Sequence, residues 1–148
     1  MYKHILVATD GSALSRKAIR TAVGLAKSEG ARVTGVYAIR PFVPMSYGEG
    51  IAYASPRDAA AYRKAAEREA KKALATLDVE ARIADVASAR AIANSALPWQ
   101  GILRTAKSRK CDLIVMASHG RGSIGGLILG SETTKVLSHS KIPVLVCR

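Results

Sequence analysis

Aromatic residues and cysteines are scarce in this chain. Only 5% of its 148 residues are aromatic, with one tryptophan and one phenylalanine, and no stacking consensus of an RNA-binding module surrounds them. The two cysteines, Cys111 and Cys147, lie far apart in apolar segments and outside any metal or redox spacing, so both are predicted to be buried small hydrophobes. The sequence therefore argues against a disulfide scaffold and a zinc module.

Long apolar runs are absent as well. None approaches the roughly 18 to 20 residues that a membrane-spanning helix requires. Met1 leads directly into a predicted strand, without the charged and apolar regions of a signal peptide. With cysteines that need no oxidising environment, these features predict a cytoplasmic protein that has no membrane partner.

Acidic residues are also few. The chain has 11 Asp and Glu against 23 Lys and Arg, which gives a net charge of +12. Basic proteins often bind nucleic acid or anionic surfaces. Here the cations are spread from Lys3 to Arg148, and the densest stretch, 63–72, is interleaved with Glu67 and Glu69 as on a solvated helix face. This distribution disfavours specific nucleic-acid binding and leaves weak, nonspecific binding open.

Apolar strands alternate with helical segments along the chain. This order predicts an α/β fold: one domain over residues 1–148, with a doubly wound, five-stranded parallel sheet and helices on both faces. The predicted strands cover residues 4–9, 32–39, 80–86, 112–117 and 142–147. A segment at 87–96 is interpreted as a polar connection, and 40–55 as a long loop of the lid or partner-binding kind. Pro143 favours an edge position for the last strand.

Capping residues mark the helices. Ser12 and Gly30 are predicted to begin and end the first helix, and Ser55-Pro56-Arg57-Asp58 is typical of the start of a second. An alanine-rich stripe follows in that second helix and is expected to pack in the core: Tyr62, Ala66, Ala70, Ala73 and Leu77. A third helix is predicted over 98–108, with Trp99 as a surface residue that covers its start. Ser131 is predicted to cap a short fourth helix.

The segment from Cys111 to Ser131, CDLIVMASHGRGSIGGLILGS, joins an apolar strand to a glycine-rich loop and a helix start. Backbone amides in such a loop approach an anion without interference from Cβ atoms, and the helix start adds free amides and a positive dipole end. The segment therefore predicts a phosphate or nucleotide site. It is no P-loop, because Gly126 and Leu127 stand where lysine and a hydroxyl belong. It is also no dinucleotide fingerprint, because it lies outside a first βα unit and no acidic residue follows about 20 positions later.

A third pattern fits better. Ala117-Ser118-His119-Gly120, nine further residues, then Gly130-Ser131 resembles the G-x-x-G, nine-residue, G-[ST] loop of the universal stress protein family, with alanine in place of the first glycine. Residues 2–12, YKHILVATDGS, are similar to the family's first strand and acidic turn, and 141–146, KIPVLV, to its last strand. The resemblance covers nearly the whole chain. It implies strand order 3-2-1-4-5, ATP binding, and a homodimer formed through the last strand.

The resemblance also implies the residues of the site. In this strand order, the crevice between strands one and four brings Asp10 opposite the glycine loop. Asp10 is expected to contact ribose or a metal, although Asp-Gly-Ser is equally typical of a turn. Ala38 and Met116 are expected against adenine, with Thr9 lining the base pocket. Residues implied at the phosphates, through backbone amides or hydroxyls, are Gly120, Gly130, Ser131, Glu132 and Thr133.

Two of these positions raise physical questions. The Glu132 carboxylate would repel phosphate unless it turns outward or is bridged by Mg²⁺, which is expected to be held mainly through the phosphates. Ala117 departs from the family glycine. If that glycine is needed for positive φ, alanine costs on the order of 1 kcal/mol, whereas if it only allows close approach, a methyl group still fits beside ribose.

Catalysis has little support in the sequence. His119 is the only imidazole near the loop, and it fits a phosphate contact, a base or a surface residue; no Ser-His-Asp arrangement accompanies it. We therefore expect an ATP-binding regulatory protein that changes its partner interactions with nucleotide state, although the resemblance leaves slow ATP hydrolysis or autophosphorylation open. The alternatives are a nucleotide-free adaptor, because some family branches lack the loop, and a basic nucleic-acid-associated protein.

Overall fold

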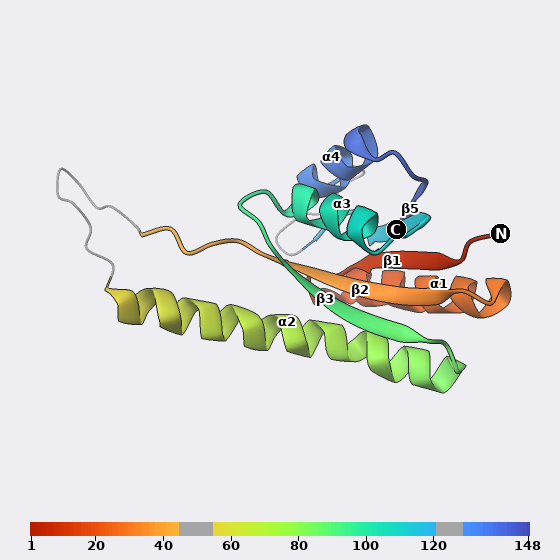
Figure 1. Cartoon of the computed structure of the whole chain (residues 1–148), viewed down its shortest axis with the longest axis horizontal. Coiled ribbons are helices and arrows are strands. Elements are labelled where there is room, and N and C mark those ends of the chain that lie inside the picture. The colour runs from red at the N-terminus through yellow and green to blue at the C-terminus, as the bar shows by residue number, and fades with distance from the viewer. Residues whose placement is uncertain (45–54, 121–128) are drawn as a thin grey trace.

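The computed structural model describes residues 1–44, 55–120 and 129–148. The elements, in chain order, are β1 (His4–Ala8), α1 (Ala13–Glu29), β2 (Arg32–Ile39), α2 (Pro56–Ala84), β3 (Ser88–Asn94), α3 (Pro98–Ser108), β4 (Leu113–Ala117), α4 (Ser131–His139) and β5 (Val144–Cys147). The strands form one parallel sheet in the order β3-β2-β1-β4-β5 (Figure 1). The predicted fold class and strand order are therefore confirmed.

Helices cover both faces of the sheet. Ile5 and Val7 of β1 pack in a core with α1 and the second half of α2, whereas Leu6 and Ala8 pack with α3 and α4. Figure 1 shows α3 and α4 on the side of the sheet opposite α2. A strand buried on both faces has an unbroken apolar run, which is what made β1 and β4 readable in the sequence.

The predicted helix starts and ends are largely confirmed. The Ser12 hydroxyl accepts a hydrogen bond from the Ser15 amide (3.2 Å) at the start of α1, and Gly30 ends that helix with φ of 64°. Ser55 and Asp58 form a reciprocal capping box at the start of α2. At α4 the N-cap is Gly130 and not Ser131, since the first helical hydrogen bond runs to the Gly130 carbonyl.

The predictions for residues 80–96 are wrong. Residues 80–86 are no strand, because α2 continues to Ala84 with Leu77 and Ala81 buried against the sheet. The third strand lies instead in the segment interpreted as a connection, as β3, which pairs with β2. Most of its side chains are exposed at the edge of the sheet, so it lacks the apolar run that identifies the other strands.

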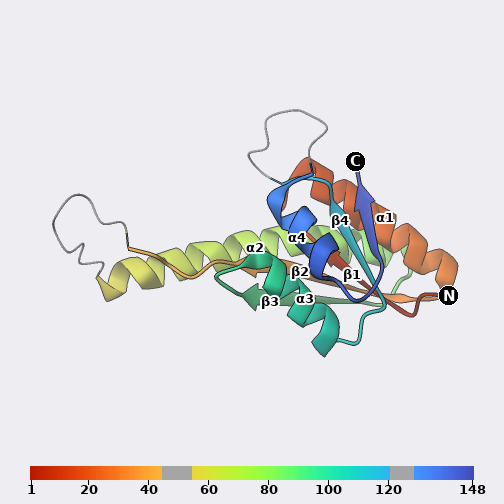
Figure 2. The ribbon, with the colours of Figure 1, turned by 90° about the horizontal axis from the view of Figure 1, so that it is seen from above.

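α2 is 29 residues long, and its first half projects beyond the sheet (Figures 1 and 2). Tyr62 and Ala66 therefore lie outside the core, contrary to the prediction. Tyr62 packs against Phe42 instead, with ring centroids 5.4 Å apart, and donates to the Arg40 carbonyl (3.0 Å). The rest of the predicted stripe is buried: Ala70, Ala73 and Leu77. Residues 45–54 of the predicted lid loop lie outside the described residues.

Both cysteines are buried and unpaired, as predicted. Burial, together with the nearby Asp112 carboxylate, raises the pKa of Cys111 to about 11, so its thiol stays protonated at neutral pH. β5 lies at an edge of the sheet, as Pro143 indicated, although it begins at Val144 and not at residue 142. Within the described residues, no helix is long and apolar enough to cross a membrane.

The contact between β2 and α2 yields a test of the fold. A Cβ atom at Gly35 would lie 2.7 Å from the Leu77 Cδ2 atom and 3.0 Å from the Leu74 Cδ2 atom, whereas one at Gly24, on the exposed face of α1, would meet no atom within 4 Å. We expect Gly35→Val to lower the free energy of unfolding by about 1–3 kcal/mol through overpacking. The control, Gly24→Ala, should raise it by about 0.5–1 kcal/mol. Denaturant unfolding measures both, and an unchanged Gly35→Val protein would contradict the packing of α2 on β2.

Candidate functional site

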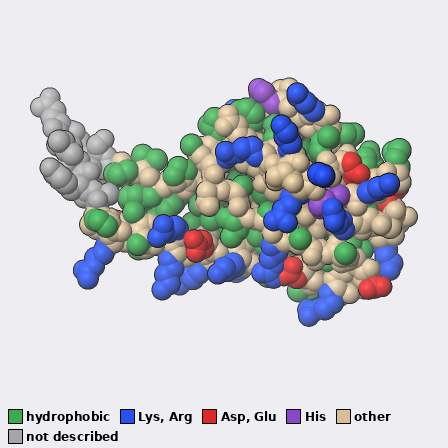
Figure 3. All heavy atoms as spheres, viewed as in Figure 1, with side chains coloured by type: hydrophobic (Ala, Val, Ile, Leu, Met, Phe, Trp, Pro, Cys, Tyr) green, Lys and Arg blue, Asp and Glu red, His purple; other side chains and the backbone are tan. Residues whose placement is uncertain are grey.

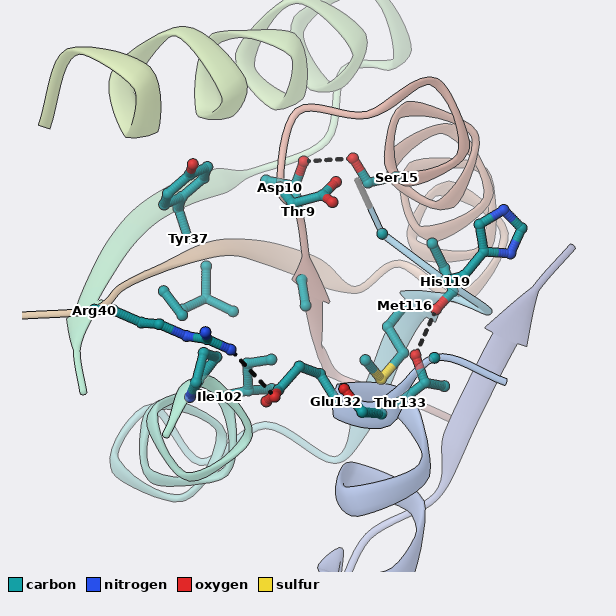
Figure 4. Close-up of a pocket in the computed structure, with 18 residues that line it drawn as sticks. Thr9, Asp10, Ser15, Tyr37, Arg40, Ile102, Met116, His119, Glu132 and Thr133 are labelled. Carbon is teal, nitrogen blue, oxygen red and sulfur yellow. Dashed lines mark hydrogen bonds and ion pairs between the residues drawn. The ribbon is translucent and has the colours of Figure 1, made fainter. Parts of the chain in front are cut away.

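A cavity of about 490 Å³ opens at the carboxyl ends of the central strands (Figure 4). It lies where the strand order reverses between β1 and β4, the position at which doubly wound sheets bind ligands. All the residues predicted for the site line it: Thr9, Asp10, Ala38, Met116, Ala117, Gly120, Gly130, Ser131, Glu132 and Thr133. The glycines at 122, 125 and 126 lie outside the described residues.

The turn after β1 is held by its own side chains. The Asp10 Oδ1 atom accepts from the Ser12 amide (3.0 Å), and Gly11 between them has φ of 78°. The Thr9 hydroxyl lies 3.0 Å from that of Ser15 and accepts from the Gly11 amide (3.1 Å). Asp10 thus forms the turn, as one interpretation of Asp-Gly-Ser predicts, and it also lines the cavity, as the other requires.

Two glycines allow the segments around the cavity to approach closely. A Cβ atom at Gly120 would lie 2.6 Å from the Asp10 Oδ2 atom, and one at Gly130 would lie 3.2 Å from the His119 Cα atom. The Gly130 amide donates to the Ser118 carbonyl (2.7 Å), so this amide is already used within the protein. No side chain in the described part of the chain caps α4. The first-turn amides from Ser131 onward are therefore the ones a ligand can reach.

Ala117 is the last residue of β4, and its backbone is ordinary. Among the described non-glycine residues, only Asp85 and Lys110 have positive φ. The Ala117 carbonyl accepts from the Thr133 hydroxyl (2.9 Å), which ties the end of β4 to α4. Position 117 therefore does not require the conformational freedom of glycine. Relative to glycine, Ala117 adds only a methyl group at the cavity wall.

Glu132 directs its carboxylate toward the start of α3. Its Oε2 atom accepts from the Trp99 amide (2.9 Å), and its Oε1 atom lies 3.6 Å from the Nη2 atom of Arg40 (Figure 4). The N-cap residue of α3, Leu97, provides no side-chain cap, so Glu132 of α4 satisfies this helix end in its place. A carboxylate at a helix N-terminus is favourable. This arrangement is the outward orientation that the sequence left as one of two possibilities.

Trp99 connects the two helices on this face. Its side chain is half-buried, and its ring lies 4.4 Å from that of His139 between centroids, so it joins α3 to α4. His139 itself is exposed. The prediction of a tryptophan that covers a helix end at the surface therefore missed the contact with α4.

The rest of the cavity wall is mainly apolar and comes partly from residues that sequence reasoning missed. Val36 of β2 and Pro98 and Ile102 of α3 lie there, beside Ala38 and Met116. Three polar residues were also missed: Ser15, Tyr37 and Arg40. Arg40 had a signal, because it directly follows β2. The α3 residues had none, since helix-to-strand packing cannot be read from periodicity alone.

His119 reaches the cavity wall from the loop after β4. Its Nδ1 atom lies 3.1 Å from the Ser118 hydroxyl, and its ring points away from the centre of the cavity (Figure 4). Ser118 is buried and does not itself line the cavity. Over residues 1–44, 55–120 and 129–148, no three His, Cys, Asp or Glu side chains converge as metal ligands.

Comparison with known proteins agrees with this geometry. The sequence model of the universal stress protein family matches residues 1–148. The chain is 33% identical over 148 residues to a universal stress protein of Thermus aquaticus and 34% identical over 149 residues to universal stress protein YxiE of Bacillus subtilis, with 100% of both chains covered in each case. A universal stress protein solved in complex with cAMP superimposes with a TM-score of 0.72 at 25% identity, over 99% of this chain and 97% of that one. The chain belongs to the universal stress protein family.

The Glu132 contacts lead to a stability prediction. Glu132→Ala removes the acceptor for the Trp99 amide and should lower the free energy of unfolding by about 0.5–2 kcal/mol, as the loss of a helix cap does. Glu132→Gln keeps an acceptor and loses only the partly exposed ion pair with Arg40, so we expect a loss below about 1 kcal/mol. Chemical denaturation compares the two variants. Equal losses would mean that the charge of Glu132, and not its capping hydrogen bond, stabilises this end of α3.

Proposed function

We propose that this universal stress protein binds ATP with Mg²⁺ in the cavity at the carboxyl ends of the strands, and changes its partner interactions with nucleotide state as a single-domain cytoplasmic protein. One observation carries the proposal: the residues implied by the family loop and by the acidic turn converge on one cavity from β1, β2, β4 and α4. A relative of the same fold, 25% identical, is bound to an adenine nucleotide, cAMP.

The cavity has two chemically different parts. Val36, Ile102 and Met116 provide an apolar slot suited to a flat base. The uncapped start of α4, from Ser131 onward, provides amides and the positive end of a helix dipole, which suit phosphate groups. Asp10 lies beside Gly120 and is placed to meet ribose hydroxyls or a metal ion. An adenine nucleotide matches this order of apolar, hydroxyl-binding and anion-binding surfaces.

Mg²⁺ fits the site only as a companion of the phosphates. This ion is usually bound by one or two carboxylates together with phosphate oxygens and water. Asp10 is the carboxylate beside Gly120, whereas that of Glu132 is engaged by the Trp99 amide and Arg40. Bound in this way, Mg²⁺ would neutralise phosphate charge.

Binding, and not turnover, is the proposed role. The phosphate end offers amides and hydroxyls, and the hydrogen bond between Ser118 and His119 involves a buried hydroxyl that does not line the cavity. A nucleotide that is held without rapid hydrolysis can report its own concentration through occupancy of the cavity. Partner binding would then depend on nucleotide occupancy.

Titration calorimetry with MgATP tests the proposal. We expect binding to the wild-type protein, and loss of binding in Gly130→Asp, where a carboxylate would face the phosphates. Gly130→Ala is the matched control, because it adds the same crowding against His119 without charge, so it should retain more affinity.

The Ala117→Gly variant should bind MgATP as tightly as the wild-type protein or more tightly. The gain in affinity should be at most about tenfold, which corresponds to about 1.4 kcal/mol.

Absence of binding to the wild-type protein at millimolar ATP would contradict the proposal and favour the nucleotide-free adaptor. Mass spectrometry of freshly purified, denatured protein gives an independent reading, because a tightly held adenine nucleotide copurifies. The nucleic-acid alternative predicts steeply salt-dependent binding to DNA or RNA instead.

We also propose that two copies pair through β5. β5 is an apolar edge strand with Leu145 39% exposed. The carbonyls of Pro143 and Cys147 accept from the amides of Ile114 in β4 and of Ser118 just after it, so in the alternating pattern of a strand the main-chain groups of Val144 and Val146 point outward. Soluble proteins rarely leave such an edge open, and a two-fold axis lets one edge satisfy the other without forming a fibre.

Val144→Pro tests the dimer. It removes the outward amide of Val144 but no amide bonded to β4, so the protein should shift toward monomer in analytical ultracentrifugation. Val144→Ala keeps the amide and is the control, and circular dichroism checks that both variants are folded. A wild-type protein that sediments as a monomer at tens of micromolar would contradict pairing through β5.

A further inference from the structure

A second cavity, of about 400 Å³, lies at the opposite edge of the sheet, where the strands begin. His4 of β1 and Thr34 of β2 line it. These residues lie two positions before Leu6 and Val36, which pack in the core under α3, so they share the sheet face that α3 covers. α3 ends at Ser108, and beyond that point the apolar face gives way to these two polar side chains.

The lining of this cavity is rich in cations. Arg32 from the start of β2 and Arg109 and Lys110 from the turn after α3 line it, and Ser88 adds a hydroxyl, whereas the Ser108 hydroxyl donates to the Thr105 carbonyl (3.2 Å). No acidic residue lines it, and within the described chain none of the three cations forms an ion pair. Figure 3 shows Lys and Arg side chains gathered on this face toward the end where the strands begin. A wall of donors without a carboxylate suits an anion.

His4 is a buried residue of the same cavity. The residue is 6% exposed, and its Nε2 atom lies 2.8 Å from the Thr34 hydroxyl. Its Nδ1 atom is buried and makes no hydrogen bond of ordinary geometry to the described residues, although the Arg109 backbone carbonyl acts on the ring as a hydrogen-bond acceptor. Burial is the main cause that lowers the pKa of His4, and the Arg32 charge adds to it, while the Arg109 carbonyl and Asp112 act in the opposite direction.

The backbone at Lys110 is the third observation. Lys110 has φ of 54°, and the Cys111 amide donates to the Ala106 carbonyl (2.8 Å), which is the turn that usually ends a helix with glycine. α1 ends in the same turn with Gly30 at that position. A lysine here is strained where glycine would not be, and the same residue lines the cavity.

We propose that this cavity is an anion site, separate from the nucleotide cavity, which binds inorganic phosphate or the phosphate group of a small monoester. The cations come from β2 and from the turn after α3. The guanidinium groups of the two arginines and the ammonium group of the lysine suit the several oxygens of a phosphate dianion. His4 lines the same cavity and reports on a ligand bound there. The cavity volume leaves room for the organic part of a monoester.

Histidine NMR of the full chain, titrated with inorganic phosphate at neutral pH, tests the site. We expect a saturable shift of the His4 ring signals at millimolar phosphate, and a rise in the pKa of His4 because a bound anion opposes the effect of Arg32. Glycerol phosphate, titrated in parallel, distinguishes the two candidate ligands. Tighter binding of glycerol phosphate than of inorganic phosphate identifies a monoester as the ligand, and weaker binding identifies the free ion. Absence of a saturable His4 shift with both probes would overturn the proposal.

Matched variants distinguish phosphate binding in this cavity from a general effect of the protein's positive charge. Lys110→Gly should weaken phosphate binding by about tenfold and yet raise the melting temperature without phosphate, because it removes both the cation and the backbone strain. Asp85→Gly relieves the same strain at the end of α2, outside the cavity, so it should raise the melting temperature without weakening binding. Lys107→Gln removes one nearby charge and should leave the affinity unchanged. Equal weakening in Lys107→Gln and Lys110→Gly, or loss of the His4 shift in Gly130→Asp, would overturn the proposal.

Discussion

The position of β1, between β2 and β4 in a parallel sheet, is the constraint on which the rest of the structure depends. Ile5 pairs with Val33 on one side and with Leu113 on the other, and both faces of the strand are buried. After β1 the chain therefore turns toward β2, and after β4 it turns toward β5, so these two connections run in opposite directions. A crevice opens between these two paths, and the cavity lies there. The nucleotide proposal depends on this topology before it depends on any side chain.

Charges around that crevice are balanced within the protein. Glu132 is bound by the Trp99 amide and Arg40, and one oxygen of Asp10 is used in its own turn. Glu132 thereby links α4, α3 and the end of β2 at the cavity wall. The repulsion expected between Glu132 and a phosphate is reduced, because its charge is directed to the start of α3. The start of α4 then offers a ligand amides in place of a carboxylate.

Much of the fold was predictable because local signals and burial agree. β1 and β4 are buried on both faces and have continuous apolar runs, and Ser12, Gly30 and Ser55 mark helix ends through backbone geometry. β3 could not be predicted in this way. It is an exposed edge strand, and its place depends on pairing with β2, which is a nonlocal property. The end of α2 was mistaken for a strand because alternate apolar residues also occur there.

The candidate site was predictable to a similar degree and for a different reason. Its loop residues follow a spacing, and the reversal of strand order brings that spacing to Asp10. Ile102 belongs to no motif and reaches the cavity only through tertiary packing, so the sequence could not place it, whereas Arg40 could have been found because it directly follows β2. The conformation at Ala117 also needed the structure, which shows that its φ is not positive and that only the methyl group is at issue.

The two edges of a parallel α/β sheet differ in what they offer an anion. Helix N-termini lie at the carboxyl edge, so amides and dipoles attract phosphate there without charged side chains. At the other edge, helices end with carbonyls, and an anion site must be made of cations. Arg109 and Lys110 also stabilise the C-terminus of α3, because positive charges interact favourably with the negative end of the helix dipole. This effect alone would explain why these two residues are there. That reason does not extend to Arg32, which comes from β2. A bound anion accounts for all three cations.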